Sequence, residues 1–346
     1  MHNRIYYLDV LRALAIMMVF TAHSVLSFGA PQSISGLQFG GTGVDLFFLL
    51  SGWLIGSQLF AEKSKFNNVD VKRFWIRRWM RTLPAYYVVL LATVAQLVLT
   101  KDSFKSPLPY FAFIQNYDYP LTYFYISWSL SVEEQFYLVI APLLVVLFKF
   151  KASVQSIGLL TLLITPSLFR SLGWFDSLVE THVRWDCCLM GVFLAHSAHH
   201  YSQQWAKMTK FKIPIGLTGL TAFLCFFYFR WYPPYLGYQD PSFLILALTF
   251  GCLVFFAVNT PVLTKPLGYQ LIMHISTRSY SIYLLHPEAL AICRRYFAEQ
   301  GFLVHFASAL LITLCIAEVL FRVVEMPFIN MRNNFAFSAK RARNDD

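Results

Sequence analysis

The first hydrophobic segment of the chain contains three polar side chains that could do chemistry: Asp9, Arg12 and His23. The steps of three and eleven residues between them are close to whole helical turns, so a helix would place all three on one face. His23 would then lie roughly 16 Å above Arg12. An imidazole can accept a proton from a hydroxyl group, and we therefore predict that His23 is a catalytic general base. A buried histidine with a purely structural role is the alternative.

Other charged residues occur where later hydrophobic segments begin, and we expect them at the level of His23. They are Asp45, Glu133, Glu134, Arg184 and Asp186. We predict that Asp45, Glu133 and Glu134 assist His23 in catalysis, with Asp45 or Glu133 fixing its tautomer. Arg184, Asp186 and His286 are predicted to bind the substrate. Together, His23 and the five charged residues Asp45, Glu133, Glu134, Arg184 and Asp186 would line one polar chamber open to the outside. Structural ion pairs are the alternative, because charges inside a membrane face either a cavity or each other.

The most basic part of the chain, residues 61–81, ends with Arg77, Arg78 and Arg81. In a helix these arginines lie on neighbouring faces. Arginine suits bidentate recognition of phosphate. We therefore predict that they form, with Arg12, an inner binding site for a phosphorylated cosubstrate. The ordinary excess of positive charge in cytoplasmic loops, or binding of anionic lipid headgroups, would also explain the cluster.

Long hydrophobic segments must position these residues. A bilayer core is crossed by roughly 20 mostly apolar residues in a helix. The sequence predicts about ten such spans, near 7–28, 41–60, 82–100, 129–148, 153–171, 185–200, 212–229, 242–259, 277–296 and 303–322. The expected fold is all-α, a polytopic membrane bundle over 1–330 followed by a short basic cytoplasmic tail over 331–346. The stretch 107–127 is too short and too polar to span and is expected to be an extracytoplasmic loop.

The composition supports a membrane protein, since 57% of the residues are hydrophobic and only 13% are charged. Soluble domains contain roughly 25% charged residues. Most of the 28 Lys and Arg residues fall on one side of the predicted spans, which places both termini in the cytoplasm. This bias also explains the net charge of +10, and we expect no nucleic-acid partner. The first segment is similar to a signal peptide, but Asp9 and Arg12 within it favour a retained span.

Motifs of several other enzyme classes are missing from the sequence. It contains no P-loop, no HExxH zinc motif and no Gly-x-Ser-x-Gly nucleophile elbow. The six cysteines lie in apolar stretches without metal-ligand spacing. We therefore expect no metal site and no tightly bound cofactor.

Seven short motifs occur in order along nearly the whole chain. They are Leu8 to Ala15 with His23, Gly43 to Gly52, Arg77-Arg78 with Arg81 and Pro84, Trp128 to Tyr137, Arg184 to Gly191, Tyr283 to Pro287, and Glu325 to Phe328. This set resembles the acyltransferase 3 family of membrane O-acyltransferases. The resemblance implies a ten-helix acyltransferase domain that uses cytoplasmic acyl-coenzyme A, with acetyl-coenzyme A as the expected donor. It also implies critical roles for the first-span His23 and Arg12 and for the basic motif. The family usually has Arg where Met326 stands here.

The expected protein is thus a multi-pass enzyme of the plasma or inner membrane, with membrane lipid, acyl-coenzyme A and a carbohydrate acceptor as its partners. The arginines would hold the coenzyme A phosphates, and His23 would activate a hydroxyl group of an extracytoplasmic glycan or glycan precursor. A covalent acyl-histidine intermediate is a variant. Two other classes stay open. A transporter or flippase also contains intramembrane charges, and a membrane scaffold is the third class, although it leaves the clustered arginines without a purpose.

Overall fold

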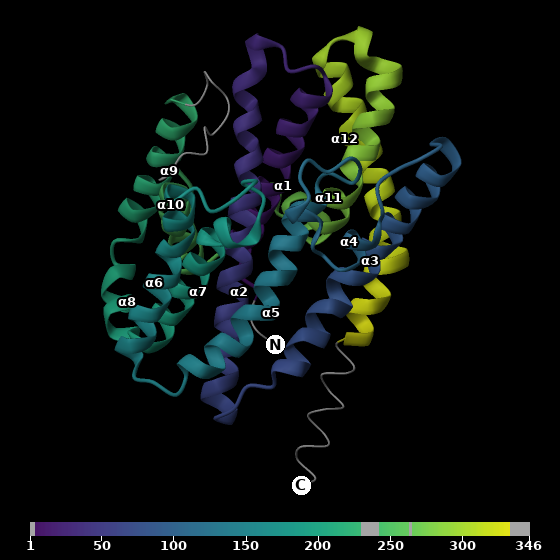
Figure 1. Cartoon of the computed structure of the whole chain (residues 1–346). Helices are drawn as coiled ribbons and strands as arrows, with labels where there is room; N and C mark the ends of the chain where they lie inside the picture. The colour runs from purple at the N-terminus through teal and green to yellow at the C-terminus, as the bar shows by residue number, and fades with distance from the viewer. Residues whose placement is uncertain (1–3, 230–241, 263–264, 333–346) are drawn as a thin grey trace.

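The computed structural model describes residues 4–229, 242–262 and 265–332, and these residues form helices and loops without strands (Figure 1). The helices are α1 (Tyr6–Ser27), α2 (Gly43–Phe66), α3 (Val71–Thr100), α4 (Leu108–Phe111), α5 (Ser127–Leu147), α6 (Ala152–Ser171), α7 (Asp186–His200), α8 (Ser202–Thr209), α9 (Lys212–Phe229), α10 (Ser242–Val258), α11 (Tyr269–Phe297) and α12 (Phe302–Leu320). A 3-10 segment, Gln32–Thr42, precedes α2, and a π-helical turn, Phe321–Glu325, follows α12. The predicted all-α fold is confirmed.

Seven helices among the described residues are long and apolar enough to cross a membrane. They are Tyr6–Ser27, Gln32–Phe66, Val71–Thr100, Ser127–Leu147, Ala152–Ser171, Lys212–Phe229 and Phe302–Arg332, and Phe243–Val258 is apolar but shorter. Helices α7 and α11 coincide with predicted spans but do not meet this criterion of length and hydropathy. A multi-pass membrane bundle is therefore supported, whereas the predicted count of about ten spans is not confirmed.

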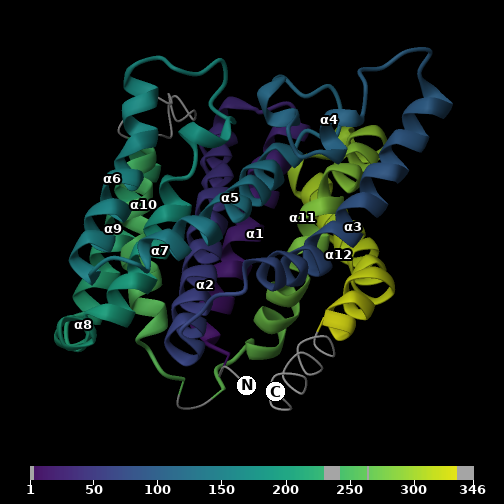
Figure 2. The same cartoon turned by 60° about the horizontal axis from the view of Figure 1, so that its bottom comes forward.

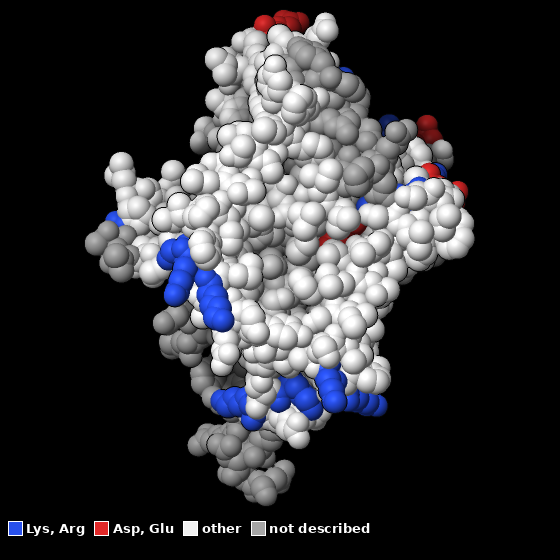
Figure 3. All heavy atoms as spheres, turned by 90° about the vertical axis from the view of Figure 1, so that its left-hand side faces the viewer, with Lys and Arg blue, Asp and Glu red and all other residues white. Residues whose placement is uncertain are grey.

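The beginning of α1 and the end of the last helix lie at the same end of the bundle, at the bottom of Figure 1. Figure 2 brings this end forward and shows α1 between α2 and α11. Helices α6, α7, α9 and α10 lie on one side of this centre, and α3 and α12 lie on the other. On the face shown in Figure 3, Lys and Arg gather in the lower half and the upper middle is largely uncharged. The arrangement agrees with the predicted placement of both termini on one side.

The closest packing in the bundle joins α2 to α7 through glycines. A methyl group added at Gly52 would collide with the backbone carbonyl of Cys188, and one added at Gly191 would collide with the carbonyl of Leu49. Small residues allow helix backbones to approach in this way, and van der Waals contact then holds the helices together in lipid. The backbones of α2 and α7 are therefore in close contact beside the centre of the molecule.

Tyrosines hold the loop between α3 and α5 against the second half of α3, close to the start of α5. The hydroxyl of Tyr86 donates to the carbonyl of Tyr110 at 2.8 Å, and the hydroxyl of Tyr110 donates to the carbonyl of Tyr123 at 3.0 Å. Within this loop the only helical pieces are the four-residue α4 and a 3-10 turn, Gln115–Tyr117. The prediction that 107–127 does not span is confirmed.

The last helix extends to Arg332, slightly past the predicted end of the membrane domain at residue 330. Of the predicted basic tail, residues 333–346 lie outside the described part of the chain.

Candidate active site

A narrow cavity lies among α1, α2, α3, α5 and α11. Its wall is made of Arg12, Val44, Phe47, Phe48, Leu50, Ser51, Leu54, Arg78, Arg81, Thr82, Ser129, Leu130, Glu133, Tyr137, Ser279, Tyr280 and Tyr283. The cavity volume is about 100 Å³. Small-molecule pockets usually enclose about 300–1,000 Å³. The cavity can therefore hold a slender chain or one phosphoryl-sized group, but it cannot enclose a nucleotide.

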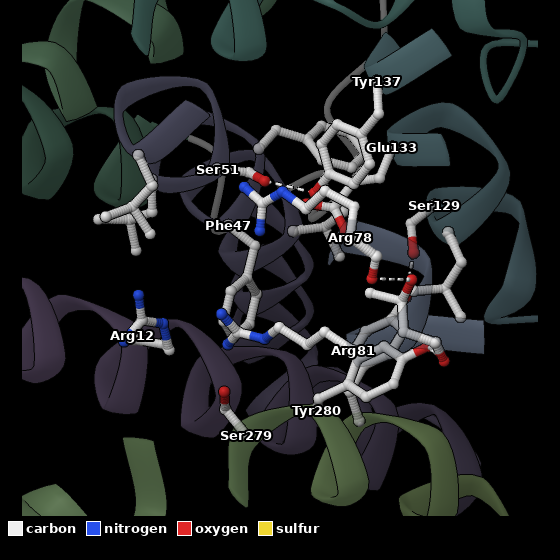
Figure 4. A pocket seen from close by; sticks show the side chains of 17 residues that line it. Arg12, Phe47, Ser51, Arg78, Arg81, Ser129, Glu133, Tyr137, Ser279 and Tyr280 are labelled. Carbon is white, nitrogen blue, oxygen red and sulfur yellow. Dashed lines mark hydrogen bonds between the residues drawn. The ribbon is translucent and has the colours of Figure 1, made fainter. Parts of the chain in front are cut away.

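Three arginines direct positive charge into this cavity. Figure 4 shows the guanidinium groups of Arg78 and Arg81 pointing into the same space from α3, with Arg12 facing it from α1. Arg12 is held in place by Asp9, whose carboxylate accepts a hydrogen bond from its Nη1 at 2.8 Å. Arg78 lies over the ring of Tyr137 at 4.9 Å, and neither Arg78 nor Arg81 has an ion-pair partner within the described residues.

The glutamates of α5 lie beside these arginines instead of at the level of the first-helix histidine. Glu133 lines the cavity close enough to Arg78 and Arg81 for electrostatic attraction. Glu134 is buried outside the cavity and accepts a hydrogen bond from Thr82 Oγ1 at 2.7 Å. Both residues follow the start of α5 by about two turns, which carries them down to the arginines. The predicted grouping of these glutamates with His23 is therefore wrong.

The predicted shared face of the first helix is confirmed by its contacts with α11. Arg12 Nη1 donates to Ser276 Oγ at 3.2 Å, and His23 Nδ1 lies 2.6 Å from His286 Nε2. The ten residues between these two α11 partners match the eleven between Arg12 and His23, so the two helices run side by side. Arg12 therefore lies near the beginning of the α1–α11 pair, and His23 lies further along it, toward the ends of both helices.

The histidine pair lies beside the end of the cavity that is farther from Arg12. Ser129 and Tyr283 line that end, and their hydroxyl groups are 2.5 Å apart. Tyr283 precedes His286 by one turn of α11, and its carbonyl is 2.7 Å from His286 Nδ1. His286 is fully buried, whereas His23 is partly exposed next to the ring of Tyr125. Along α5, from Tyr137 to Ser129, the cavity extends over roughly 12 Å.

Four other charged residues form a separate, closed network. The carboxylate of Asp45 accepts a hydrogen bond from Arg184 Nη2 at 2.9 Å, and Asp186 accepts two from Arg170, both at 2.9 Å. All four side chains are buried. The predictions that Asp45 orients His23, and that one chamber gathers all these groups, are wrong because the Asp45 carboxylate binds Arg184, two residues before the start of α7. The same network occupies Arg184 and Asp186, the residues predicted to bind substrate.

Sequence reasoning also misplaced one arginine and missed several residues. Arg77 does not line the cavity. Arg332, in contrast, lies near Arg77, Arg78 and Arg81, although nothing in its sequence neighbourhood indicates this. The hydroxyl-bearing residues that line the cavity were not predicted as site residues: Ser51, which was interpreted as a helix-packing contact, Thr82, Ser129, Tyr137, Ser279, Tyr280 and Tyr283. Several of them fall within the quoted motifs, which was the available signal.

Comparisons with known proteins agree with this architecture. A family model described as an acyltransferase domain matches residues 5–322. The chain is 29% identical to the peptidoglycan O-acetyltransferase OatA of Listeria monocytogenes, over 95% of this chain and 57% of the relative. It is 26% identical to the O-acetyltransferase OatA of Staphylococcus aureus, over 92% of this chain and 56% of the relative.

The chain thus spans a little more than half the length of these curated relatives. No solved structure matches it significantly. The family match covers nearly the whole bundle, including the arginine-lined cavity and the histidine pair. The chain belongs to this family of acyltransferase domains.

Proposed function

We propose that this chain is a membrane O-acyltransferase that moves an acetyl group from acetyl-coenzyme A, supplied at the cytoplasmic side, to a hydroxyl group of an extracytoplasmic glycan. The observation that carries the proposal is the cavity in which Arg12, Arg78 and Arg81 converge below the His23–His286 pair. The membrane is the plasma or inner membrane.

Binding of the acyl donor is proposed from the positive charge in the cavity that has no ion-pair partner. Arg78 and Arg81 face the cavity without a carboxylate in direct contact, and Glu133 is the one carboxylate among the residues that line it. A guanidinium inside a membrane bundle that lacks an ion pair calls for an anionic ligand. Arginine forms strong bidentate hydrogen bonds with phosphate. Because the cavity is small, the adenosine would remain at the cytoplasmic mouth with its phosphates directed at the arginines, and the narrow thioester arm would extend through the cavity.

Activation of the acceptor hydroxyl is assigned to His23. Its partly exposed position near Tyr125 allows approach from the outer side. In the transfer step His23 takes the proton of the acceptor hydroxyl while the oxygen attacks the thioester carbonyl. A C–O bond forms, the C–S bond breaks, and the proton passes to the departing thiolate of coenzyme A. No group is oxidised or reduced.

The acceptor class follows from the relatives. The Listeria relative is named for peptidoglycan. We therefore propose a cell-envelope glycan as the acceptor, with peptidoglycan as the first candidate to be tested.

The test uses the purified chain in proteoliposomes with radiolabelled acetyl-coenzyme A and soluble peptidoglycan fragments, and measures O-linked label on the glycan. General base catalysis contributes roughly 10²–10⁴-fold. The variant His23→Ala is therefore expected to lose at least about 100-fold in kcat. His274→Ala is the matched control, because His274 lies on α11 at its cytoplasmic end and outside the cavity; it should keep wild-type transfer.

Full transfer by His23→Ala would refute the assignment of the base. Uptake of labelled donor into the vesicles without any labelled glycan would instead favour the transporter class.

A further inference from the structure

The two histidines between α1 and α11 meet edge to edge. Their rings are almost coplanar, with an interplanar angle of 4°, and His23 Nδ1 lies 2.6 Å from His286 Nε2. One nitrogen must donate and the other must accept, because two lone pairs or two N–H groups at this distance would repel each other. The direction of this hydrogen bond depends on the second nitrogen of each ring.

The second nitrogen of His286 contacts only backbone carbonyl groups. Nδ1 lies 2.7 Å from the carbonyl oxygen of Tyr283 and 3.3 Å from that of Ile282. A carbonyl oxygen can accept a hydrogen bond but cannot donate one. His286 Nδ1 therefore carries a proton, an assignment made from its partners.

The residue after His286 explains why the Tyr283 carbonyl is available. In a regular helix this carbonyl would accept from the backbone N–H four residues later. That residue is Pro287, which has no backbone N–H. The hydroxyl of Tyr283 donates to the Ile126 carbonyl at 3.0 Å, which ties this turn of α11 to the start of α5. The Tyr-Leu-Leu-His-Pro sequence thus creates a free, fixed acceptor and places the imidazole against it.

In the neutral form of His286, the proton on Nδ1 leaves only a lone pair on Nε2. His286 Nε2 must then accept from His23, so the single proton of neutral His23 is on Nδ1. The lone pair of His23 is consequently on Nε2, a nitrogen that has no hydrogen-bond partner within the described residues. That nitrogen is the one free to take a proton from an incoming hydroxyl.

We infer that His286 is a positioning residue: it fixes His23 in the tautomer whose Nε2 can take the proton of the substrate hydroxyl. Two hydrogen bonds achieve this, one from His286 Nδ1 to the Tyr283 carbonyl and one from His23 Nδ1 to His286 Nε2. This role rests on the proposed function. It differs from substrate binding, the role predicted for His286 from the sequence, because the ring is fully buried and both of its nitrogens are already occupied.

The first test does not depend on activity. Nitrogen NMR of the chain labelled with ¹⁵N-histidine distinguishes protonated from unprotonated ring nitrogens, and the signals of His23 are identified by their loss in His23→Ala. The expected result is a protonated Nδ1 and an unprotonated Nε2 in the wild type and in His286→Gln, whose amide oxygen can still accept. In His286→Leu, the tautomer of His23 that is protonated on Nδ1 should no longer be the main form. The opposite tautomer of His23 in the wild type would overturn the inference.

The second test separates positioning from packing. A triad histidine left in the wrong tautomer loses about 10⁴-fold in kcat. We expect His286→Leu to lose at least ~100-fold in kcat with KM for both substrates within about 3-fold. His286→Gln should keep kcat within about 10-fold of the wild type. Equal kcat losses in the two variants, with both melting like the wild type, would show a structural role and contradict the inference.

The two proposals fail differently. If His23→Ala removes transfer while His286→Leu leaves kcat unchanged, the proposed function stands and the positioning role is wrong. If both variants keep full activity, the base assignment itself fails. In the His23→Ala background, His286→Leu should cause no further loss, because its effect acts through His23.

Discussion

Two clusters of arginines and carboxylates lie inside the same bundle, and they differ in how their charges are paired. In the closed network, Arg170 binds Asp186 through two nitrogens at 2.9 Å, and Arg184 binds Asp45 at 2.9 Å. In the cavity, Arg78 and Arg81 lack direct ion pairs within the described chain. The four named residues of the first cluster carry equal numbers of positive and negative charges, whereas the residues that line the cavity keep an excess of positive charge.

This difference separates charges that hold helices together from charges that bind a ligand. Desolvating an ion is costly unless a partner compensates for it. The closed network supplies its own partners, and the guanidinium of Arg184 is also stacked over the rings of Trp128 at 5.0 Å and Phe243 at 4.0 Å. The cavity leaves part of that compensation to water or to an incoming anion. Both clusters combine arginines with carboxylates inside the bundle, so the lack of ion pairs at Arg78 and Arg81, together with their partial exposure, is the property that indicates function.

The largest effect is expected from breaking the closed network. Replacement of Asp186 by Ala removes the carboxylate that accepts two hydrogen bonds from Arg170, and breaking a buried ion pair of this kind costs about 3–5 kcal/mol. The apparent free energy of unfolding, measured in detergent by denaturant titration, should fall by this amount. KM for the acyl donor should stay within about 3-fold in the fraction that remains folded. If Asp186→Ala weakened donor binding without lowering stability, the closed network would have to be assigned to the active site.

A smaller effect is expected in the cavity, and it should appear in binding. Replacement of Arg81 by Gln removes charge-assisted hydrogen bonds worth about 1.5–3 kcal/mol. The Kd for coenzyme A, measured by isothermal titration, should therefore rise roughly 10- to 100-fold. Stability should change little, because the substitution removes both the repulsion of Arg81 from Arg78 and its attraction to Glu325 and Glu133. Loss of folding stability with unchanged affinity would contradict the assignment of this cluster to the donor.

The smallest effect is expected at Arg77, one turn before Arg81 on the same helix. Arg77 does not line the cavity. Arg77→Gln therefore serves as the matched variant for Arg81→Gln and should raise the Kd for coenzyme A less than about 3-fold, which corresponds to under about 0.7 kcal/mol. An effect as large as that of Arg81→Gln would restore the equal roles that the sequence motif predicts for the three arginines of α3.

The sequence predicted what depends on local periodicity. The helical spacing of Arg12 and His23 correctly placed both against one neighbour, and the polar composition of 107–127 correctly excluded a span there. The clustering of Arg78 and Arg81 with Arg12 also followed from their predicted depth. These inferences need only the geometry of one helix and the distribution of charge across a bilayer.

The partners of the charged residues could not be predicted in the same way. Glu133 was expected near His23 because both seemed to lie close to the outer surface, but α3 begins at Val71 and carries its arginines two turns into the helix, where Glu133 meets them. Arg170, the partner of Asp186, is 16 residues away in the sequence and on another helix. Depth along a helix does not specify which side of the bundle a residue faces. Tertiary packing decides this, and it separated the predicted chamber into a cavity, a histidine pair and a closed network.

The central claim is that donor and acceptor use opposite ends of one bundle, the arginine end and the histidine end. Membrane vesicles of both orientations test it directly, because acetyl-coenzyme A does not cross the bilayer unaided. We predict labelled glycan only when acetyl-coenzyme A is supplied on the face where α3 begins and the glycan is on the opposite face. Transfer that requires both substrates on the histidine face would contradict the account.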